Sequence, residues 1–205
     1  QEEPLFAAIW SVLHNRPFLH LVFATSLFLF ALNSMQMVLP FWVRLVLHEG
    51  DAKVTTLMAP LLVVTMSVFV FVPWLAARIG KHAMFLGSIG AMVLCMLMFL
   101  GIGRIPLGSP LLQTGVVLAL VGVPMAGLSA LPFALIADVI DFDEVRTGRR
   151  REALFIALQG TVQKVFAALV GLAFGALAYS GAKSEPTVEG LIRVVVVTTI
   201  VCAVA

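Results

Sequence analysis

Charged residues are scarce in this chain, and their scarcity decides its broad class. Only 12% of the 205 residues are charged, 61% are hydrophobic, and the mean hydropathy is +1.08. A soluble globular domain carries about 25% charged residues, so the composition excludes an ordinary soluble domain and indicates a membrane protein. The net charge of +2 arises from small clusters between apolar runs, which gives no reason to expect nucleic acid as a partner.

Cysteine is equally rare. Cys95 and Cys202 lie in two separate apolar runs, where a thiol is most simply a small packed hydrophobic side chain. Their number and spacing exclude a disulfide framework and a metal site built on paired cysteines. A secretory signal is also missing, because residues 1–16 mix acids, His and Trp without the basic, apolar and small-residue regions of such a signal.

Long apolar runs dominate what is present. We predict an all-α bundle of transmembrane helices with spans at about 18–46, 57–77, 83–102, 111–137, 153–179 and 191–205. The last run is too short to cross a hydrocarbon layer roughly 30 Å thick, so we expect the chain to be a fragment. The basic turn at 78–82 and the basic block at 146–151 place their loops on the cytoplasmic side by the positive-inside rule.

Polar groups interrupt the first span. Asn33 and Gln36 either line a cavity or hydrogen-bond across a packed helix face, and the sequence leaves both possibilities open. Trp42 lies beyond the bend expected at Pro40, where it is typical of the aromatic belt at a membrane surface. The alternative for Trp42 is that it stacks on a ligand.

Acidic and basic residues are both concentrated in the loop after the fourth span. Asp138, Asp141 and Glu144 recur every third residue, so a continuing helix would carry them on one side of its C-terminal end. Negative charge opposes the helix dipole there, and the acids therefore need cationic partners. Arg149 and Arg150 follow at once, and a guanidinium can bind a carboxylate through two hydrogen bonds. We predict that these five residues form a cytoplasmic gate.

The fifth span carries a lysine near its middle. Lys164 lies about twelve residues past Glu152, hence roughly 18 Å along a helix, where an ammonium facing lipid would cost about 2.5 to 3.5 kcal/mol. Gln159 and Gln163 are four residues apart and share a face, with Lys164 about 100° round from Gln163. We predict that the three bind a polyhydroxylated or anionic solute. The alternative is a structural lysine bonded to backbone carbonyls of a neighbouring helix.

No acidic residue lies inside the predicted spans to balance this lysine. Its counter-charge must therefore come from an anionic substrate, from loss of its own proton, or from a carboxylate elsewhere in a larger protein.

These motifs resemble those of one family. The pattern A-D-x-x-D-x-x-E at 137–144, T-G-x-R at 147–150 and the embedded Lys164 occur in the order seen in the glycoside-pentoside-hexuronide:cation symporters. N-R-P-F at 15–18 and L-P-F at 39–41 extend this similarity, which covers most of the chain, to the melibiose permease-like branch of the major facilitator superfamily. The resemblance implies the C-terminal half, helices 7 to 12, of a twelve-helix carrier made of inverted three-helix repeats.

The resemblance also implies a function. The chain would be half of a secondary active transporter, and not an enzyme, that moves a sugar, glycoside or related small polar solute by alternating access with a sodium ion or proton. No cofactor is implied, and the coupling ion would bind mainly in an N-terminal six-helix half. That half, the solute and the lipid bilayer would be the partners. The location would be a plasma membrane, as in the bacterial inner membrane, with both ends of this half in the cytoplasm.

Two alternatives stay open. A lysolipid or other amphiphile carrier of the same fold is favoured by the shortage of stacking aromatics in the fourth span, which contains only Phe133. A membrane phosphatidyltransferase would use Asp138, Asp141 and Asp143 as metal ligands. It would also need a D-G-x-x-A-R continuation, whereas Phe142 follows Asp141 here.

Overall fold

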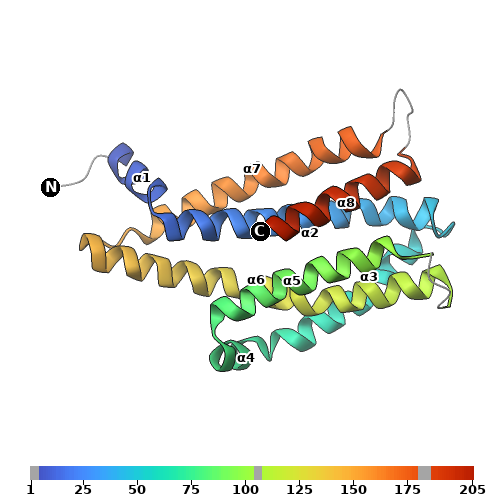
Figure 1. Ribbon diagram of the computed structural model, residues 1–205, viewed down its shortest axis with the longest axis horizontal. Helices are drawn as coiled ribbons and strands as arrows, with labels where there is room; N and C mark the ends of the chain where they lie inside the picture. The colour runs from blue at the N-terminus through green and yellow to red at the C-terminus, as the bar shows by residue number, and fades with distance from the viewer. Residues whose placement is uncertain (1–4, 104–107, 180–185) are drawn as a thin grey trace.

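The computed structural model describes residues 5–103, 108–179 and 186–205, and this part of the chain is helical with no β-strand (Figure 1). The prediction of an all-α fold is thereby confirmed. The helices are α1 (Leu5–Leu13), α2 (Arg16–Leu45), α3 (Ala52–Phe69), α4 (Val72–Ile79), α5 (Lys81–Leu100), α6 (Pro110–Thr147), α7 (Glu152–Ala178) and α8 (Val188–Val204).

Local sequence signals set the helix ends. The Asn15 side chain accepts a hydrogen bond from the Phe18 amide at the start of α2, and Ser109 does the same for the Leu112 amide at the start of α6. Gly148 ends α6 in the left-handed conformation, with φ of 67°, that side chains with a Cβ rarely adopt. α6 runs on to residue 147, so the acidic residues after 137 do lie on a continuing helix.

Five helices are long and apolar enough to cross a membrane by length and composition, namely α2, α3, α5, α6 and α7. The stretch 57–77, which we predicted as one span, is divided between α3 and α4, with Pro73 in the first turn of α4. α8 has 17 residues and continues the bundle as a sixth apolar helix. The described chain is therefore a polytopic helical bundle, as the sequence predicts.

The helices form two packed groups. α2 lies against α7 and α8, α6 lies against α3 and α5, and the groups meet where α5 contacts α8 and α2 contacts α6. Exchanging α2 with α6, α3 with α7 and α5 with α8 converts these contacts into one another, whereas the contact between α7 and α8 has no counterpart of similar extent between α3 and α5. Two related three-helix repeats would give this pattern, although no internal sequence similarity points to it.

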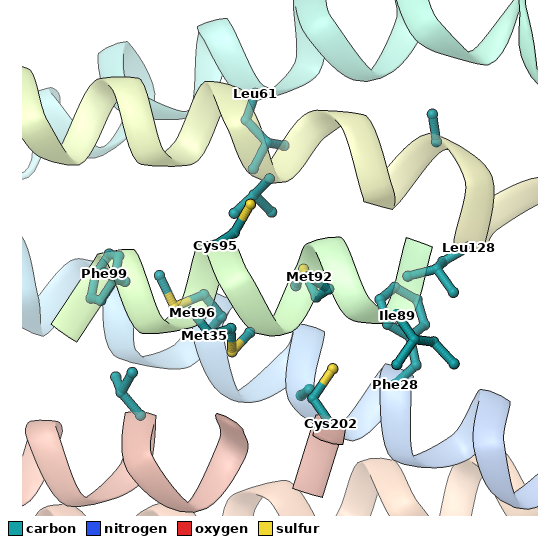
Figure 2. Close-up of a cluster of buried hydrophobic side chains, with 14 of the residues drawn as sticks. Phe28, Met35, Leu61, Ile89, Met92, Cys95, Met96, Phe99, Leu128 and Cys202 are labelled. Carbon is teal, nitrogen blue, oxygen red and sulfur yellow. The ribbon is translucent and has the colours of Figure 1, made fainter. Parts of the chain in front are cut away.

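The centre of the bundle is apolar. Figure 2 shows side chains of α2, α5 and α8 meeting there, among them Met35, Met92 and Cys202. Both cysteines are buried and free, which confirms their reading as packed hydrophobic residues. α6 comes especially close to α3 at Gly122, where a Cβ would lie 2.8 Å from the Leu61 carbonyl oxygen.

The two ends of the bundle differ. In Figure 1 α1, the start of α2 and the connection between α6 and α7 lie at the left end. The C-terminal ends of α2 and α7 and the starts of α3, α6 and α8 lie at the opposite end. The acidic and arginine-rich segment at 138–152 therefore lies at the same end as α1 and the start of α2.

Candidate functional site

A buried ion pair joins three helices at the end of the bundle that carries residues 138–152, which we call the charged end. Arg151 Nη2 donates to Asp143 Oδ2 over 3.0 Å, and the two side chains are only 10% and 6% exposed. Asn15 Nδ2 donates to the other Asp143 oxygen over 3.4 Å. Asp143 belongs to α6, Arg151 immediately precedes α7, and Asn15 caps α2. The network thus fixes the relative position of three helix ends, and replacing Asp143 would break a buried ion pair.

A second ion pair joins α5 to α6. The ammonium of Lys81, the first residue of α5, donates to both carboxylate oxygens of Asp138 over 2.6 and 2.8 Å. Both side chains are nearly half exposed, so the pair is worth only about 0 to 1 kcal/mol. The predicted gate residue Asp138 is thus paired with the basic turn at 78–82 and not with the arginine run.

Arg150 joins two further acids. Its guanidinium donates to Glu144 and to Glu152 over 3.2 Å each. The hydrogen bond with Glu152 and the negative charges of Glu144, Glu152 and Asp141 raise the pKa of Arg150 above its ordinary value. Arg150 and Glu144 were predicted to lie in one gate, and the structure brings them together. Arg149 lies exposed in the connection between the two helices.

Asp141 differs from its neighbours because it forms no ion pair within the described residues. It lines a cavity of about 170 Å³ between α6 and α7, together with Phe133, Arg150, Glu152 and Gln159. Gln159 is 94% buried, since its relative exposure is 6%. The cavity thus combines a carboxylate, an amide, a guanidinium and the face or edge of an aromatic ring, which are groups that orient polar organic ligands.

The three polar residues predicted on α7 do not share one environment. Gln159 faces the cavity with Asp141, Gln163 is half-buried, and Lys164 is exposed. Lys164 lies in a stripe of small exposed residues that includes Gly171 and Gly175, where an added Cβ would meet nothing within 4 Å. This stripe faces away from the packed helices, so α7 presents its lysine outside the six-helix bundle.

The candidates on α2 lie elsewhere. Asn33 donates to the Leu29 carbonyl over 2.7 Å, a bond within its own helix, and Gln36 borders a small gap between α2, α3 and α6. Trp42 is 3% exposed and lies against Phe99 with ring centroids 4.6 Å apart. The structure thus gives Trp42 a packing contact in the core, and places none of the three beside Asp141 and Gln159.

Comparison with known proteins decides the class. The family model described as MFS/sugar transport protein matches residues 1–205, the whole of the chain. The chain belongs to the MFS/sugar transport protein family. A protein of Synechocystis named as an uncharacterized symporter is 46% identical over 65 residues, which are 32% of this chain and 11% of that relative. The chain therefore matches only a small part of the relative's length, and no solved structure matches it significantly.

Family membership confirms the resemblance seen in the sequence. The MFS chain is a multi-pass membrane protein whose family is described as one of transport proteins. The arrangement of the acids agrees with this, because Asp138 and Asp143, which a phosphatidyltransferase would hold around a metal together with Asp141, face two different cations.

The sequence analysis missed Asp143 and Arg151 as site residues of the MFS chain. A signal for Asp143 was present: Ile136, Ile140, Asp143 and Thr147 follow the i, i+4, i+7, i+11 spacing of one helix face. Ile136 and Ile140 are buried, so the residue next along that face is buried too. An acid in such a position requires a cation, which the nearby arginines supply.

Proposed function

We propose that this MFS chain is one half of a cation-coupled symporter that moves a sugar, glycoside or related small polar solute by alternating access. The observation that carries the proposal is the cavity between α6 and α7. It offers the Asp141 carboxylate, the buried Gln159 amide and the Phe133 ring within one small volume. Carboxylates and amides accept and donate hydrogen bonds to hydroxyl groups, and a ring covers the apolar face of a sugar.

A second six-helix half supplies what this half lacks. Lys164 lies on a helix that is apolar enough to cross the membrane, yet its side chain is exposed on the outer face of α7. Facing lipid would cost about 2.5 to 3.5 kcal/mol, so a partner surface or a water-filled cavity covers it. The small residues around Lys164 allow another helix to approach closely. We place the counter-charge and the coupling ion, sodium or a proton, in that second half.

The charged end acts as the cytoplasmic gate of this carrier. The pairs Lys81–Asp138 and Arg150–Glu144 lie within one half, and contacts that persist in both conformations shift no equilibrium. Asp141, which has no ion-pair partner within the described residues, is the acid best able to bind a cation from the other half when the inner side closes.

The charged end faces the cytoplasm of a plasma membrane in this proposal. Arg146, Arg149, Arg150 and Arg151 lie together at that end, and basic residues accumulate on the cytoplasmic side of membrane proteins. α1, the first described helix, lies at the same end in Figure 1.

An amphiphile is the second candidate solute. A cavity of about 440 Å³ lies between α5 and α6 at the opposite end, and its walls are largely apolar, including Met98, Leu112 and Val116. Such apolar walls suit part of an acyl chain better than the hydroxyl groups of a sugar. The two solute classes are distinguished by direct uptake of radiolabelled glycosides and of a labelled lysophospholipid in the same vesicles.

Replacement of Lys164 by Met tests the proposal. In the complete carrier, uptake should fall by roughly tenfold or more, the equivalent of about 1.4 kcal/mol of lost solute or ion binding, while membrane abundance stays normal. Lys53→Met is the matched control, because Lys53 is an exposed lysine at the other end of the bundle. Undiminished uptake at normal abundance would contradict the proposal, and loss of abundance would assign Lys164 a structural role.

A further inference from the structure

The short helix α1 exposes an apolar face that the bundle leaves uncovered. Phe6, Trp10 and Leu13 are 85%, 67% and 36% exposed, and their i, i+4, i+7 spacing puts them on one side of the helix. Val12, on another side, is fully buried against the bundle. α1 is therefore held by the bundle through one face while it presents three large apolar side chains to its surroundings.

The position of α1 places this face at a membrane surface. α1 ends at Leu13 and α2, a candidate membrane span, begins at Arg16, so α1 lies within a few residues of the hydrocarbon layer. In Figure 1 it lies at an angle beside the first turns of α2. Tryptophan is enriched at the membrane–water interface, and amphipathic helices lie in the plane of that interface with their apolar side in the acyl region.

A polar groove adjoins the same helix. It has a volume of about 280 Å³ and lies between α1 and the end of α6, where it is lined by Trp10, Ser11, His14 and Arg146 among others. His14 Nδ1 donates to the Trp10 carbonyl over 2.8 Å, and the two rings lie 4.6 Å apart. Trp10 thus belongs both to the apolar face and to the wall of the groove.

The charge of the groove is positive. Its one carboxylate, Asp143, is already bound by Arg151 and by Asn15. Arg146 is exposed and makes no ion pair within the described residues, and Arg16, also exposed, begins the next helix. An uncompensated guanidinium beside a hydroxyl and an imidazole is suited to a phosphate group, which Arg binds through parallel hydrogen bonds.

We propose that α1 lies in the membrane interface and that this groove holds the phosphate of an anionic phospholipid. The acyl chains of that lipid run along Phe6, Trp10 and Leu13, while Arg146 binds the headgroup. Basic residues beside a span attract anionic lipids, and the apolar face adds area buried in the acyl region. The lipid site is separate from the solute cavity between α6 and α7 and does not depend on which solute is carried.

Depth measurements on α1 test the first part. Nitroxide labels are attached in the complete carrier, in lipid nanodiscs, at Phe6→Cys, Trp10→Cys and Leu13→Cys, with the native cysteines replaced by alanine. Lys53→Cys, an exposed position at the opposite end of the bundle, is the control. The three face positions should be more accessible to oxygen than to a water-soluble nickel chelate, and position 53 should show the reverse. Equal accessibility at all four positions, or shielding of the face from both reagents by protein, would overturn the proposal.

Lipid binding tests the second part. The affinity for phosphatidylglycerol relative to phosphatidylcholine, measured by mass spectrometry of the extracted carrier, should fall about fivefold in Arg146→Gln. Arg146→Lys should retain most of the preference, and so should Lys53→Gln, which removes an exposed cation from the opposite end. No change in Arg146→Gln would overturn the headgroup assignment. Displacement of phosphatidylglycerol by inorganic phosphate at equal concentration would show a free-phosphate site instead and would equally overturn it.

Discussion

Replacing Asp143 by Asn should destabilise the carrier far more than replacing Asp138 by Asn, although both acids lie on the same turns of α6. Asp143 and Arg151 are 6% and 10% exposed with 3.0 Å between their polar atoms, so Asp143→Asn removes the carboxylate charge that Arg151 binds in a buried site. Breaking such a pair costs about 3 to 5 kcal/mol. The Lys81–Asp138 pair is nearly half exposed on both sides, so Asp138→Asn should cost about 0.2 to 1 kcal/mol.

The asparagine can keep one hydrogen bond to Asn15, so we expect the lower end of the first range for Asp143→Asn. For a domain of this size 1 kcal/mol moves the unfolding temperature by roughly 2 to 4 °C. About 3 kcal/mol then lowers the unfolding temperature by roughly 6 to 12 °C, against at most roughly 4 °C for the Asp138 variant.

The chain contains its own reporters for this measurement. Cys95 and Cys202 are buried and free, so a thiol-reactive dye that fluoresces on coupling reports their exposure during heating of the purified carrier. Adding Arg151→Gln to Asp143→Asn should cost less than the sum of the two single changes, because Arg151 and Asp143 bind each other directly. An unfolding temperature for Asp143→Asn that equals that of Asp138→Asn would refute the reasoning, and so would a double variant that loses as much stability as the two single changes together.

Three further outcomes are expected. Asp141→Arg should raise the labelling of cysteines placed in the inner cavity. Adding Arg150→Asp should not restore the original labelling, because Arg150 binds Glu144 and Glu152. Unchanged labelling in Asp141→Arg at normal abundance would rule out the gate. Gly122→Ala should lower the unfolding temperature, whereas Gly171→Ala should not, because the Cβ added at position 122 lies 2.8 Å from a backbone oxygen and the one at 171 meets nothing. The hydrogen bond from Arg44 lowers the pKa of Asp51, so the Arg44–Asp51 ion pair should persist as the pH falls, until the pH passes that lowered pKa. Carbon-13 NMR of labelled Asp51 should show a higher pKa in Arg44→Gln, and an unchanged pKa would contradict the assignment.

Hydropathy alone determines the class and much of the fold. A bilayer requires every backbone polar group to bond within its own helix or barrel, so long apolar runs separated by short polar turns specify a helical bundle. Charged side chains are rare inside the hydrocarbon layer because their burial there is costly. Lys164, near the middle of an apolar run, can therefore be recognised from the sequence as a candidate functional residue. The motif at 137–150 was equally readable, because its acids and arginines lie close together along the chain, and the family comparison agrees with it.

Only the tertiary structure shows which side chains from distant parts of the chain bind the acids of α6. Asp138 is bound by Lys81, 57 residues earlier, and Asp143 by Asn15, 128 residues earlier. Sequence proximity favoured the nearby arginines, and Asp143 does bind Arg151. Helix packing, however, brings the start of α5 to Asp138 and the start of α2 to Asp143. The outward direction of Lys164 and the burial of Trp42 against Phe99 likewise depend on which faces of α7 and α2 meet their neighbours. Helical periodicity fixes which residues share a face, whereas the direction of that face is set by close packing between helices distant in sequence.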